Sequence, residues 1–333
     1  MIKGNQINGG SYSLYWYGIS SADFEVGNSI DSNIIDGYYY AGIWSYYQDD
    51  ISVVGNEISS NGTYTTEYGI RHYYNDNITS VGNKIVTAGS STNYGYYIYY
   101  NNASSTSRSL MANNMVSALD NSGTTYGMYL YNCTYMDIVH NTINVNAGSA
   151  AAGHALYFGG TTTIGLDVQV LNNIAVNTGG GVALEVTSSA TGMISGMDYN
   201  NYYTTGSDLA NWGGTLVANL GNLQTASSLD GNSVFANPVF IANDDLHALG
   251  SAANNAADPF SGITTDIDGD PRSATTPDIG ADEFTPLSGD LAMLDGEFLR
   301  GECLSNNDTI VLRIQNLIGP TVDFSNDPLN GKL

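Results

Sequence analysis

A pattern of apolar and polar positions recurs along the first half of the chain. A small or apolar residue precedes an Asn, and the second position after that Asn is Ile or Met. These asparagines follow one another at steps of 23 to 31 residues. They are Asn5, Asn28, Asn56, Asn83, Asn113, Asn141 and Asn172. A recurrence with this period predicts a stacked array of similar units, each in contact with its neighbours.

A second column of apolar residues accompanies the first. The gap from each member to the next Asn of the first column varies from 9 to 16 residues. The members are Ile19, Ile43, Ile70, Ile98, Met128 and Leu156. Variable gaps between short fixed segments favour short strands joined by loops of unequal length. Helical repeats would need runs of about ten or more residues with a 3.6-residue period, which the sequence lacks, so an all-β array is predicted.

Alternation along these strands assigns side chains to two sides. Ile43, Ile70, Ile98 and Met128 of the second column are predicted to point inward, with the residues two positions before and after each. The residues immediately before them, such as Gly42 and Gly69, then point outward and leave a strip without side chains. The other outward positions are mainly aromatic. This predicted outward set is Trp44, Tyr46, Arg71, Tyr73, Tyr99, Tyr129, Tyr131 and Tyr157.

The Asn column is predicted to mark a tight bend in each coil. Asn tolerates the left-handed backbone conformation. Its amide can also hydrogen-bond the equivalent amide one coil away, because neighbouring strands are about 4.8 Å apart. We therefore expect the seven asparagines to form a structural ladder.

The repeats resemble the right-handed parallel β-helix of pectate-lyase-like proteins, which often carry such an Asn ladder. Several motifs between residues 198 and 284 resemble the C-terminal block of secreted bacterial β-helix proteins of the choice-of-anchor Q group. They are Asp198-Tyr199-Asn200, Asn237-Pro238-Val239-Phe240, Asp245-Leu246-His247, Asp266-Ile267-Asp268-Gly269-Asp270-Pro271-Arg272 and Pro277-Asp278-Ile279-Gly280-Ala281-Asp282-Glu283-Phe284. Ser251-Ala252 departs from the family, which usually has Ser-Pro there. The resemblance implies β-helix coils over 1–197 and irregular coils that close the helix over 198–284.

The residue pattern of the sequence changes after residue 284. Residues 290–292, 308–314 and 323–324 resemble the first strands of immunoglobulin-like, adhesion-related modules in surface proteins of Bacteroidetes. Such a module takes about 100 residues, so 285–333 is predicted to be a linker and a truncated segment. The first five residues already match the repeat. We therefore expect an internal piece of a longer bacterial protein that is secreted or displayed at the cell surface.

Composition narrows the classes of partner. The chain has 8 Lys and Arg against 32 Asp and Glu, a net charge of −24, which disfavours nucleic acid because phosphates need cationic side chains. The same balance suits a solvated extracellular surface that takes up divalent cations. Cys133 and Cys303 are predicted not to form a disulfide and do not have metal-ligand spacing. No apolar run reaches the roughly 18 residues of a membrane span.

Catalytic signals are weak. Lyases of the resembled fold use basic residues, and the few in the repeats fall on different columns: Lys3, Arg71, Lys84 and Arg108. A glycoside hydrolase needs carboxylates about 5 to 10 Å apart, and Asp49-Asp50 is the one adjacent acidic pair of the repeats, with Glu67 one coil on. His72 and His154 fall at inward positions and are predicted to be core or bend residues.

Two features could bind ligands. Asp266, Asp268 and Asp270 have the density of carboxylates that Ca²⁺ prefers, although Asp-Gly and Asp-Pro steps are also ordinary turn chemistry and Arg272 could pair with an Asp. The outward aromatic set suits stacking against sugar rings, but stacked aromatics also stabilise neighbouring strands. No cofactor is required by either interpretation, and Ca²⁺ is the one metal considered.

The predicted function is adhesion, display or polysaccharide binding, with polysaccharide or a cell-surface glycan as partner and without catalysis in this region. Two alternatives stay open. One is a carbohydrate-active enzyme, either a polysaccharide lyase or a glycoside hydrolase, and the other is a purely structural spacer.

Overall fold

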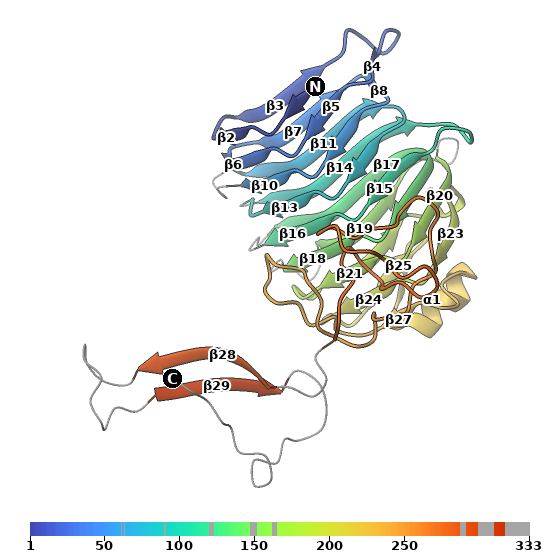
Figure 1. The fold of residues 1–333 in the computed structure, drawn as a ribbon. Helices are drawn as coiled ribbons and strands as arrows, with labels where there is room; N and C mark the ends of the chain where they lie inside the picture. The colour runs from blue at the N-terminus through green and yellow to red at the C-terminus, as the bar shows by residue number, and fades with distance from the viewer. Residues whose placement is uncertain are drawn as a thin grey trace.

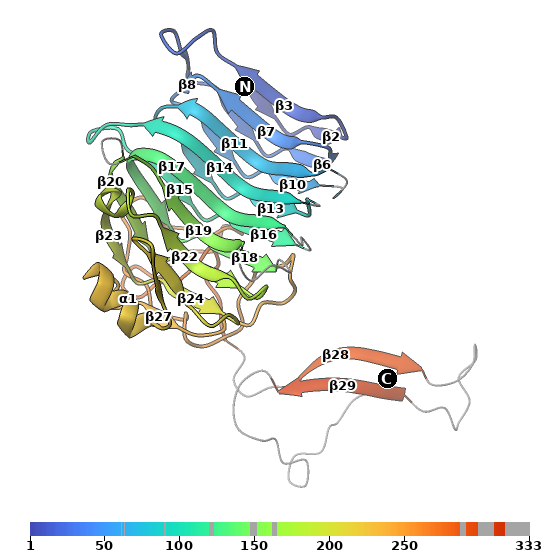
Figure 2. The ribbon, with the colours of Figure 1, turned by 180° about the vertical axis from the view of Figure 1, so that it is seen from behind.

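The computed structural model describes residues 1–60, 62, 64–89, 91–119, 123–146, 152–161, 165–286, 291–298 and 310–316, the last two ranges by their strands alone. Up to Phe235 they form a parallel β-solenoid of about seven right-handed turns, so the predicted all-β solenoid is confirmed (Figure 1). The coils follow one another in sequence order from the N-terminal end, as the view from behind also shows (Figure 2). Each coil contributes strands to three faces.

Faces 1 and 2 belong to one 16-stranded sheet, and face 3 is a separate sheet of nine strands. Face 1 consists of β3 (Tyr12–Tyr17), β7 (Ala41–Tyr46), β11 (Thr66–Asn75), β14 (Thr92–Asn102), β17 (Thr124–Val139), β19 (Gly153–Gly159), β22 (Val182–Val186), β25 (Ala210–Trp212) and β26 (Thr215–Val217). Face 2 consists of β1 (Ile2–Lys3), β5 (Ser29–Asp31), β9 (Ser52–Val54), β12 (Thr79–Val81), β15 (Ser109–Ala112), the second half of β17, β20 (Leu166–Leu171) and β23 (Ile194–Asp198). Face 3 consists of β2 (Gln6–Asn8), β6 (Ile34–Tyr38), β10 (Glu57–Ser60), β13 (Lys84–Thr87), β16 (Met115–Leu119), β18 (Thr142–Asn146), β21 (Ile174–Asn177), β24 (Asn201–Thr204) and β27 (Val234–Phe235).

The remaining elements are short. Strands β4 (Glu25–Val26) and β8 (Gln48–Asp49) pair at the corner between faces 1 and 2, and η1 (Thr191–Met193) precedes β23. Helix α1 (Leu220–Ser227) is capped by Asn219, whose side chain accepts the N–H of Asn222. Because Leu223 of this helix is fully buried in the main core, α1 covers the C-terminal end of the coils. No helix among the described residues is long and apolar enough to cross a membrane.

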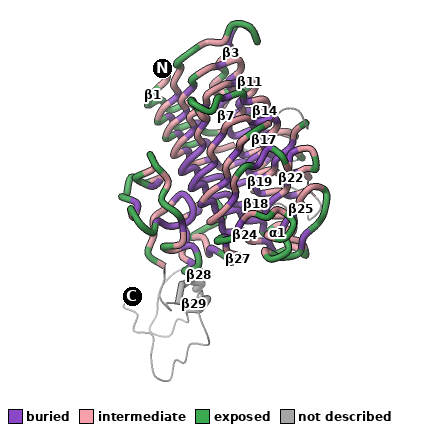
Figure 3. The backbone as a smooth tube through the Cα atoms, turned by 90° about the vertical axis from the view of Figure 1, so that its right-hand side faces the viewer, coloured by how far each residue is buried: buried purple, intermediate pink, exposed green. Residues whose placement is uncertain are grey.

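The core lies inside the coils, and buried segments recur from coil to coil along the axis (Figure 3). Ile43 pairs with Ile70, and Ile70 pairs with Tyr96. Ile98 is buried as predicted, but its place in the column was wrong. It pairs with His72 and Leu130, two residues further along the strand. The copy of Tyr68-Gly69-Ile70 in this coil is therefore Tyr94-Gly95-Tyr96.

The glycine column is inside the solenoid, so the predicted outward strip was wrong. A Cβ on Gly42 would overlap Cγ2 of Ile58, and one on Gly127 would overlap Cγ2 of Ile143. Glycine is needed here because two core layers approach closely. Each glycine and the core residue after it both lie inward, which interrupts the alternation of sides at this point. Tyr68, which precedes Gly69, therefore lies on the outer side and not in the core. The same holds for its equivalents Tyr94 and Tyr126, which continue its ring stack.

A ladder of asparagines, buried except at the exposed first member Asn5, runs along the corner between faces 2 and 3. In each step, the side-chain amide and the backbone N–H of one Asn donate to Oδ1 of the next, at 2.8 to 3.1 Å. Its members are Asn5, Asn33, Asn56, Asn83, Asn114, Asn141, Asn173 and Asn200. The predicted members Asn28, Asn113 and Asn172 lie outside it.

The left-handed conformation falls on the residue before each ladder Asn and not on the ladder Asn itself. Gly55, Asn113 and Asn172 occupy this position, with φ of 63°, 52° and 59°. Asn28 lies at a different corner, where its amide donates to Gln48 Oε1 at 2.8 Å. The bend was therefore predicted correctly. Asn113 and Asn172 take the left-handed conformation as predicted, whereas at Asn5, Asn56, Asn83 and Asn141 this conformation falls on the preceding residue.

Residues 236–286 contain no regular strand and fold back along the outer side of face 3 (Figure 1). Leu246 and Ala281 pack against Met115 of β16, while Ile279 packs against Ile174 of β21. The N–H of Ala281 donates to Thr142 Oγ1 at 2.8 Å. Within residues 198–284, the part that ends at Phe235 still contributes strands to the coils.

Two further strands, β28 (Leu291–Phe298) and β29 (Ile310–Asn316), pair antiparallel. They overlap residues 290–292 and 308–314, which were predicted as strands. Cys303 and Asp323-Phe324 lie outside the described residues.

Candidate functional site: an aromatic face around Arg71

The outer side of face 1 carries three columns of mostly aromatic side chains, because its parallel strands are in register. The first column is Tyr68, Tyr94, Tyr126 and His154. The second column is Trp44, Arg71, Tyr97, Tyr129 and Tyr157. The third column is Tyr46, Tyr73, Tyr99 and Tyr131. We call these three columns the aromatic face.

The structure brings the predicted aromatic residues together and corrects one of them. Tyr99 stands in the third column and not beside Tyr129, because this coil is shifted by two residues relative to the prediction. Tyr97 takes the place predicted for Tyr99. The sequence signal that finds Tyr97 is the Tyr-Gly pair at Tyr94-Gly95, which matches the same pair in neighbouring coils.

In the middle of the aromatic face the rings stack on one another along the axis. The Tyr97 and Tyr129 ring centroids are 4.9 Å apart with an interplanar angle of 1°, and those of Tyr129 and Tyr157 are 4.7 Å apart at 6°. Neighbouring rings therefore cover each other's faces and present their edges outward. Among the described residues, the hydroxyls of these three tyrosines have no hydrogen-bond partner within the chain. Stacking here stabilises the strand pairs, and ring edges with hydroxyls remain for a ligand.

The first coil differs, because its rings are tilted and exposed. Tyr15 is 49% exposed, and its ring centroid lies 5.0 Å from that of Trp44 at an interplanar angle of 54°. Tyr12 and Tyr17 are similarly exposed. Sequence reasoning did not include these tyrosines, although Tyr15-Trp16-Tyr17 has the spacing of Trp44-Ser45-Tyr46, with which it pairs. Open ring faces that suit the apolar side of a sugar are found at this end.

Arg71 is the cation of the aromatic face. Its guanidinium carbon lies 4.1 Å from the ring centroid of Trp44, 4.7 Å from that of Tyr68 and 4.8 Å from that of Tyr73. Nη1 donates to the Tyr40 hydroxyl at 3.3 Å. Within the described part of the chain, Arg71 forms no ion pair with a carboxylate. A cation–π cage therefore holds a charge that remains available to a ligand.

The hydroxyls of Tyr97, Tyr99 and Tyr129 stay neutral at physiological pH. Burial, with repulsion from neighbouring tyrosines, raises the pKa of Tyr99 to about 12. Burial also raises the pKa of Tyr97 and of Tyr129 above the ordinary value, and nearby Arg71 offsets only part of the effect at Tyr97. The face thus presents neutral hydroxyls around one positive charge, so it can both donate and accept hydrogen bonds.

The columns end at a pocket of about 420 Å³ on the C-terminal side. Glu185 follows Tyr157 in the second column, and its Oε2 lies 2.9 Å from His154 Nδ1. The inward position predicted for His154 was wrong, because its ring stacks on Tyr126 in the first column at 5.0 Å. His72 is fully buried as predicted and bonds Ser45 Oγ at 2.7 Å.

The other catalytic candidates are dispersed. Lys84 pairs with Asp268 on face 3, and Arg108 pairs with Asp137 and Asp167 on face 2. The basic residues considered for a lyase therefore do not meet.

The carboxylates considered for a hydrolase do not meet either. Asp49 lies at the corner between faces 1 and 2, where Oδ1 accepts from Asn77 at 2.6 Å. Glu67 is fully buried inside the coil, and burial raises the pKa of its carboxyl.

The predicted Ca²⁺ residues do not converge on one point. Asp266 accepts backbone N–H groups of Asp268 and Asp270 at 3.0 and 2.8 Å through Oδ1, and that of Glu283 at 2.9 Å through Oδ2. Its carboxylate therefore organises the turn. Arg272 pairs with Glu283 and not with these aspartates. Asp268 instead points to His247, with Oδ2 2.7 Å from Nε2.

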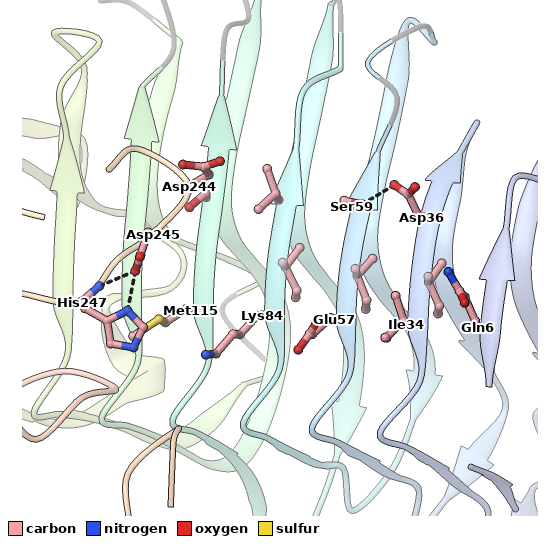
Figure 4. A pocket seen from close by; sticks show the side chains of 15 residues that line it. Gln6, Ile34, Asp36, Glu57, Ser59, Lys84, Met115, Asp244, Asp245 and His247 are labelled. Atoms are coloured by element: carbon pink, nitrogen blue, oxygen red, sulfur yellow. Dashed lines mark hydrogen bonds and ion pairs between the residues drawn. The ribbon is translucent and has the colours of Figure 1, made fainter. Parts of the chain in front are cut away.

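A groove of about 520 Å³ follows the outer side of face 3 (Figure 4). A row of paired positions from five successive coils runs along it, and the row reads Gln6, Ile34, Glu57, Lys84 and Met115. Asp244, Asp245 and His247 lie at its end (Figure 4). Its walls mix both charges with apolar side chains, and it is the second surface that could take an extended ligand.

Comparison of the chain with protein-family models, curated proteins and solved structures found no match. Face 1 and the groove on face 3 are therefore interpreted from their own geometry.

Proposed function

We propose that this solenoid binds polysaccharide through the aromatic face and serves in adhesion or display, without catalysis of its own. The observation that carries the proposal is the in-register array of outward tyrosines around the unpaired Arg71. Strand pairing repeats this array at each coil, about every 4.8 Å. A linear glycan laid along the axis would therefore meet similar groups at each step.

A neutral glycan fits this face better than a polyanion. The net charge of −24 repels a chain with many carboxylates or sulfates, while one guanidinium offers several N–H donors to sugar hydroxyls. Tyr15 and Trp44 supply the ring faces, and the stacked rings supply hydroxyls. The binding mode combines stacking at the first coil with hydrogen bonds along the columns.

Affinity electrophoresis and pull-down with neutral soluble and insoluble polysaccharides test this proposal. Tyr15→Ala should weaken binding about twofold to twelvefold, the effect of losing one aromatic contact of about 0.5–1.5 kcal/mol. The matched control is Tyr39→Ala, since Tyr39 is 44% exposed and its ring contacts Tyr64 but no ring of the three columns. Absence of binding to every neutral glycan, or equal binding by both variants, would refute the proposed face.

A location at the cell surface is part of the proposal. It is supported by the resemblance of the repeats to pectate-lyase-like β-helices, of residues 198–284 to the choice-of-anchor Q block, and of the segment with β28 and β29 to adhesion-related immunoglobulin-like modules of Bacteroidetes. Protease shaving of intact cells that express the full-length product tests it. Detection of the solenoid only inside the cells would contradict this part.

A carbohydrate-active enzyme is the second candidate, favoured by one observation. His154 and Glu185 form an acid–base pair in the pocket where the aromatic columns end, and Asp208 lines the same pocket. Reducing-sugar and unsaturated-uronide assays with the wild type and with His154→Ala decide between the two. Turnover that disappears in His154→Ala would replace the non-catalytic proposal. A chain that neither binds nor cleaves a glycan would be a structural spacer.

A further inference from the structure

A histidine and two aspartates converge at the end of the face 3 groove. One ligand atom from each of His247, Asp268 and Asp282 lies within 4.8 Å of the other two. Nε2 of His247 is 2.7 Å from Oδ2 of Asp268. The three residues come from separate turns of the C-terminal run, and Lys84 of β13 joins them through Asp268 at 2.9 Å. The fold therefore brings together side chains that are distant in sequence.

The imidazole of His247 is oriented from its other side. Nδ1 hydrogen-bonds Asp245 Oδ1, and Figure 4 shows this carboxylate beside the ring. Histidines that bind metals usually donate their second ring N–H to a carboxylate, which fixes the tautomer and directs the remaining nitrogen to the ion. Asp245 can play this part, because it leaves Nε2 directed to Asp268.

Asp282 has an unused carboxylate in this cluster. It accepts no hydrogen bond from the described residues. Its neighbour Asp266 differs, since both oxygens of Asp266 accept backbone N–H groups. A carboxylate that is close to two other acidic groups and lacks a donor is stabilised by a cation.

We propose that His247 Nε2, Asp268 and Asp282 bind one divalent cation of the Zn²⁺ class, with Asp245 as a positioning residue. One imidazole nitrogen with two carboxylates suits Zn²⁺ better than Ca²⁺, which prefers six to eight oxygen ligands. Three protein ligands leave a fourth position for water or another ligand. The ion would connect the loop of His247 to the turns of Asp268 and Asp282, and so fasten the C-terminal run.

Lys84 competes with this ion for Asp268. Its Nζ already pairs with Oδ1 of that carboxylate, and both side chains are about 40% exposed. Removal of this ammonium should therefore tighten metal binding. If the cluster were only an ion-pair network without a metal, loss of Lys84 would weaken the network and would not tighten metal binding.

The test uses the whole chain after treatment with EDTA, titrated with ZnCl₂ by calorimetry and with CoCl₂ by visible absorption. We expect one ion per chain, a Co²⁺ d–d spectrum of low coordination number and a higher melting temperature with Zn²⁺. His247→Gln and Asp282→Asn should weaken binding at least tenfold, Asp245→Asn about tenfold, and Lys84→Gln should strengthen it. Asp270→Asn is the matched control, because Asp270 is exposed on the same turn.

Three results would overturn the metal site. They are absence of Zn²⁺ binding by the folded wild type, equal binding by Asp282→Asn and Asp270→Asn, and preference for Ca²⁺ that survives His247→Gln. None of them affects the glycan proposal, which concerns face 1.

Discussion

Nδ2 of Asn56 lies 2.9 Å from Oδ1 of Asn83, and the backbone N–H of Asn56 donates to that same oxygen at 3.0 Å. One side-chain atom of Asn83 thus satisfies two buried donors of the preceding coil. The amide of Asn83 in turn donates to Asn114 Oδ1 at 3.0 Å. Each step of the ladder therefore connects the backbone of one coil to the side chain of its neighbour.

Asn83→Ala should destabilise the solenoid markedly. The change leaves the N–H of Asn56 without its acceptor and removes a contact of the Tyr96 hydroxyl. An unsatisfied buried donor costs about 1–3 kcal/mol, so we expect a loss of at least about 2 kcal/mol in urea unfolding followed by circular dichroism. Asn28→Ala is the control, because Asn28 is only partly buried and lies outside the ladder. Equal losses in the two variants would contradict the role of the ladder.

The inward glycines give a second prediction. Gly127→Ala should cost about 1–3 kcal/mol, the usual penalty for overpacking a core, because the new Cβ overlaps Ile143. Gly192→Ala should be neutral or slightly stabilising, since nothing lies within 4 Å of a Cβ there. Thermal unfolding of the two variants is the measurement. A stable Gly127→Ala protein would place this residue on the outer side after all.

The period of the sequence was sufficient for the fold, but not for every residue of the ladder. Asn113-Asn114 and Asn172-Asn173 each offer two candidates, and the motif selected the first, which takes the left-handed position. Asn28 matched the motif, but the ladder member of this coil is Asn33, five residues later. Spacing alone does not separate these alternatives, because the choice depends on which side chain the bend turns inward.

The cluster around His247 was beyond sequence reasoning for a different reason. Lys84 and Asp268 are 184 residues apart and meet because the C-terminal run folds back along face 3. The repeat period of the sequence does not indicate that the C-terminal run folds back along face 3. The turn at Asp266, Asp268 and Asp270 was recognised as acidic, but the structure directs Asp266 to backbone N–H groups and Asp268 to a histidine.

His72 predicts a loss of stability in acid. Burial lowers the pKa of His72 to about 3, against about 6.5 in an unfolded chain. The unfolded state therefore binds more protons than the folded state between these two pKa values. The contribution of neutral His72 to stability is complete above about pH 6.5 and is lost as pH falls toward 3, by at most about 1.4 kcal/mol per pH unit. Urea midpoints measured from pH 7 to pH 4 should fall less steeply in His72→Gln. Parallel curves for the two proteins would contradict the buried neutral histidine.

Asp230 predicts the opposite dependence. Burial raises the pKa of Asp230 to about 6, although hydrogen bonds from Ser233, Asn200 and Tyr202 oppose the shift. Its contribution is present below the unfolded value of about 4 and is lost as pH rises through about 6. Between pH 5 and pH 7, Asp230→Asn should therefore lose less stability than the wild type. Urea unfolding at pH 5 and pH 7 measures the loss of stability in both proteins. Equal losses in the wild type and in Asp230→Asn would refute the prediction.

Tyr129 separates the structural role of the aromatic face from its role in binding. Its ring stacks between Tyr97 and Tyr157, and each aromatic pair contributes about 0.5–1.5 kcal/mol beyond burial. Tyr129→Ala should therefore lower the free energy of unfolding by about 1–3 kcal/mol in urea titrations. Tyr129→Phe keeps both stacks and removes only the outward hydroxyl, so its stability should stay within about 0.5 kcal/mol of the wild type. If the hydroxyl array contacts glycan, Tyr129→Phe weakens polysaccharide binding at unchanged stability. If stacking is the whole purpose of the columns, Tyr129→Phe binds as the wild type does and only Tyr129→Ala is affected.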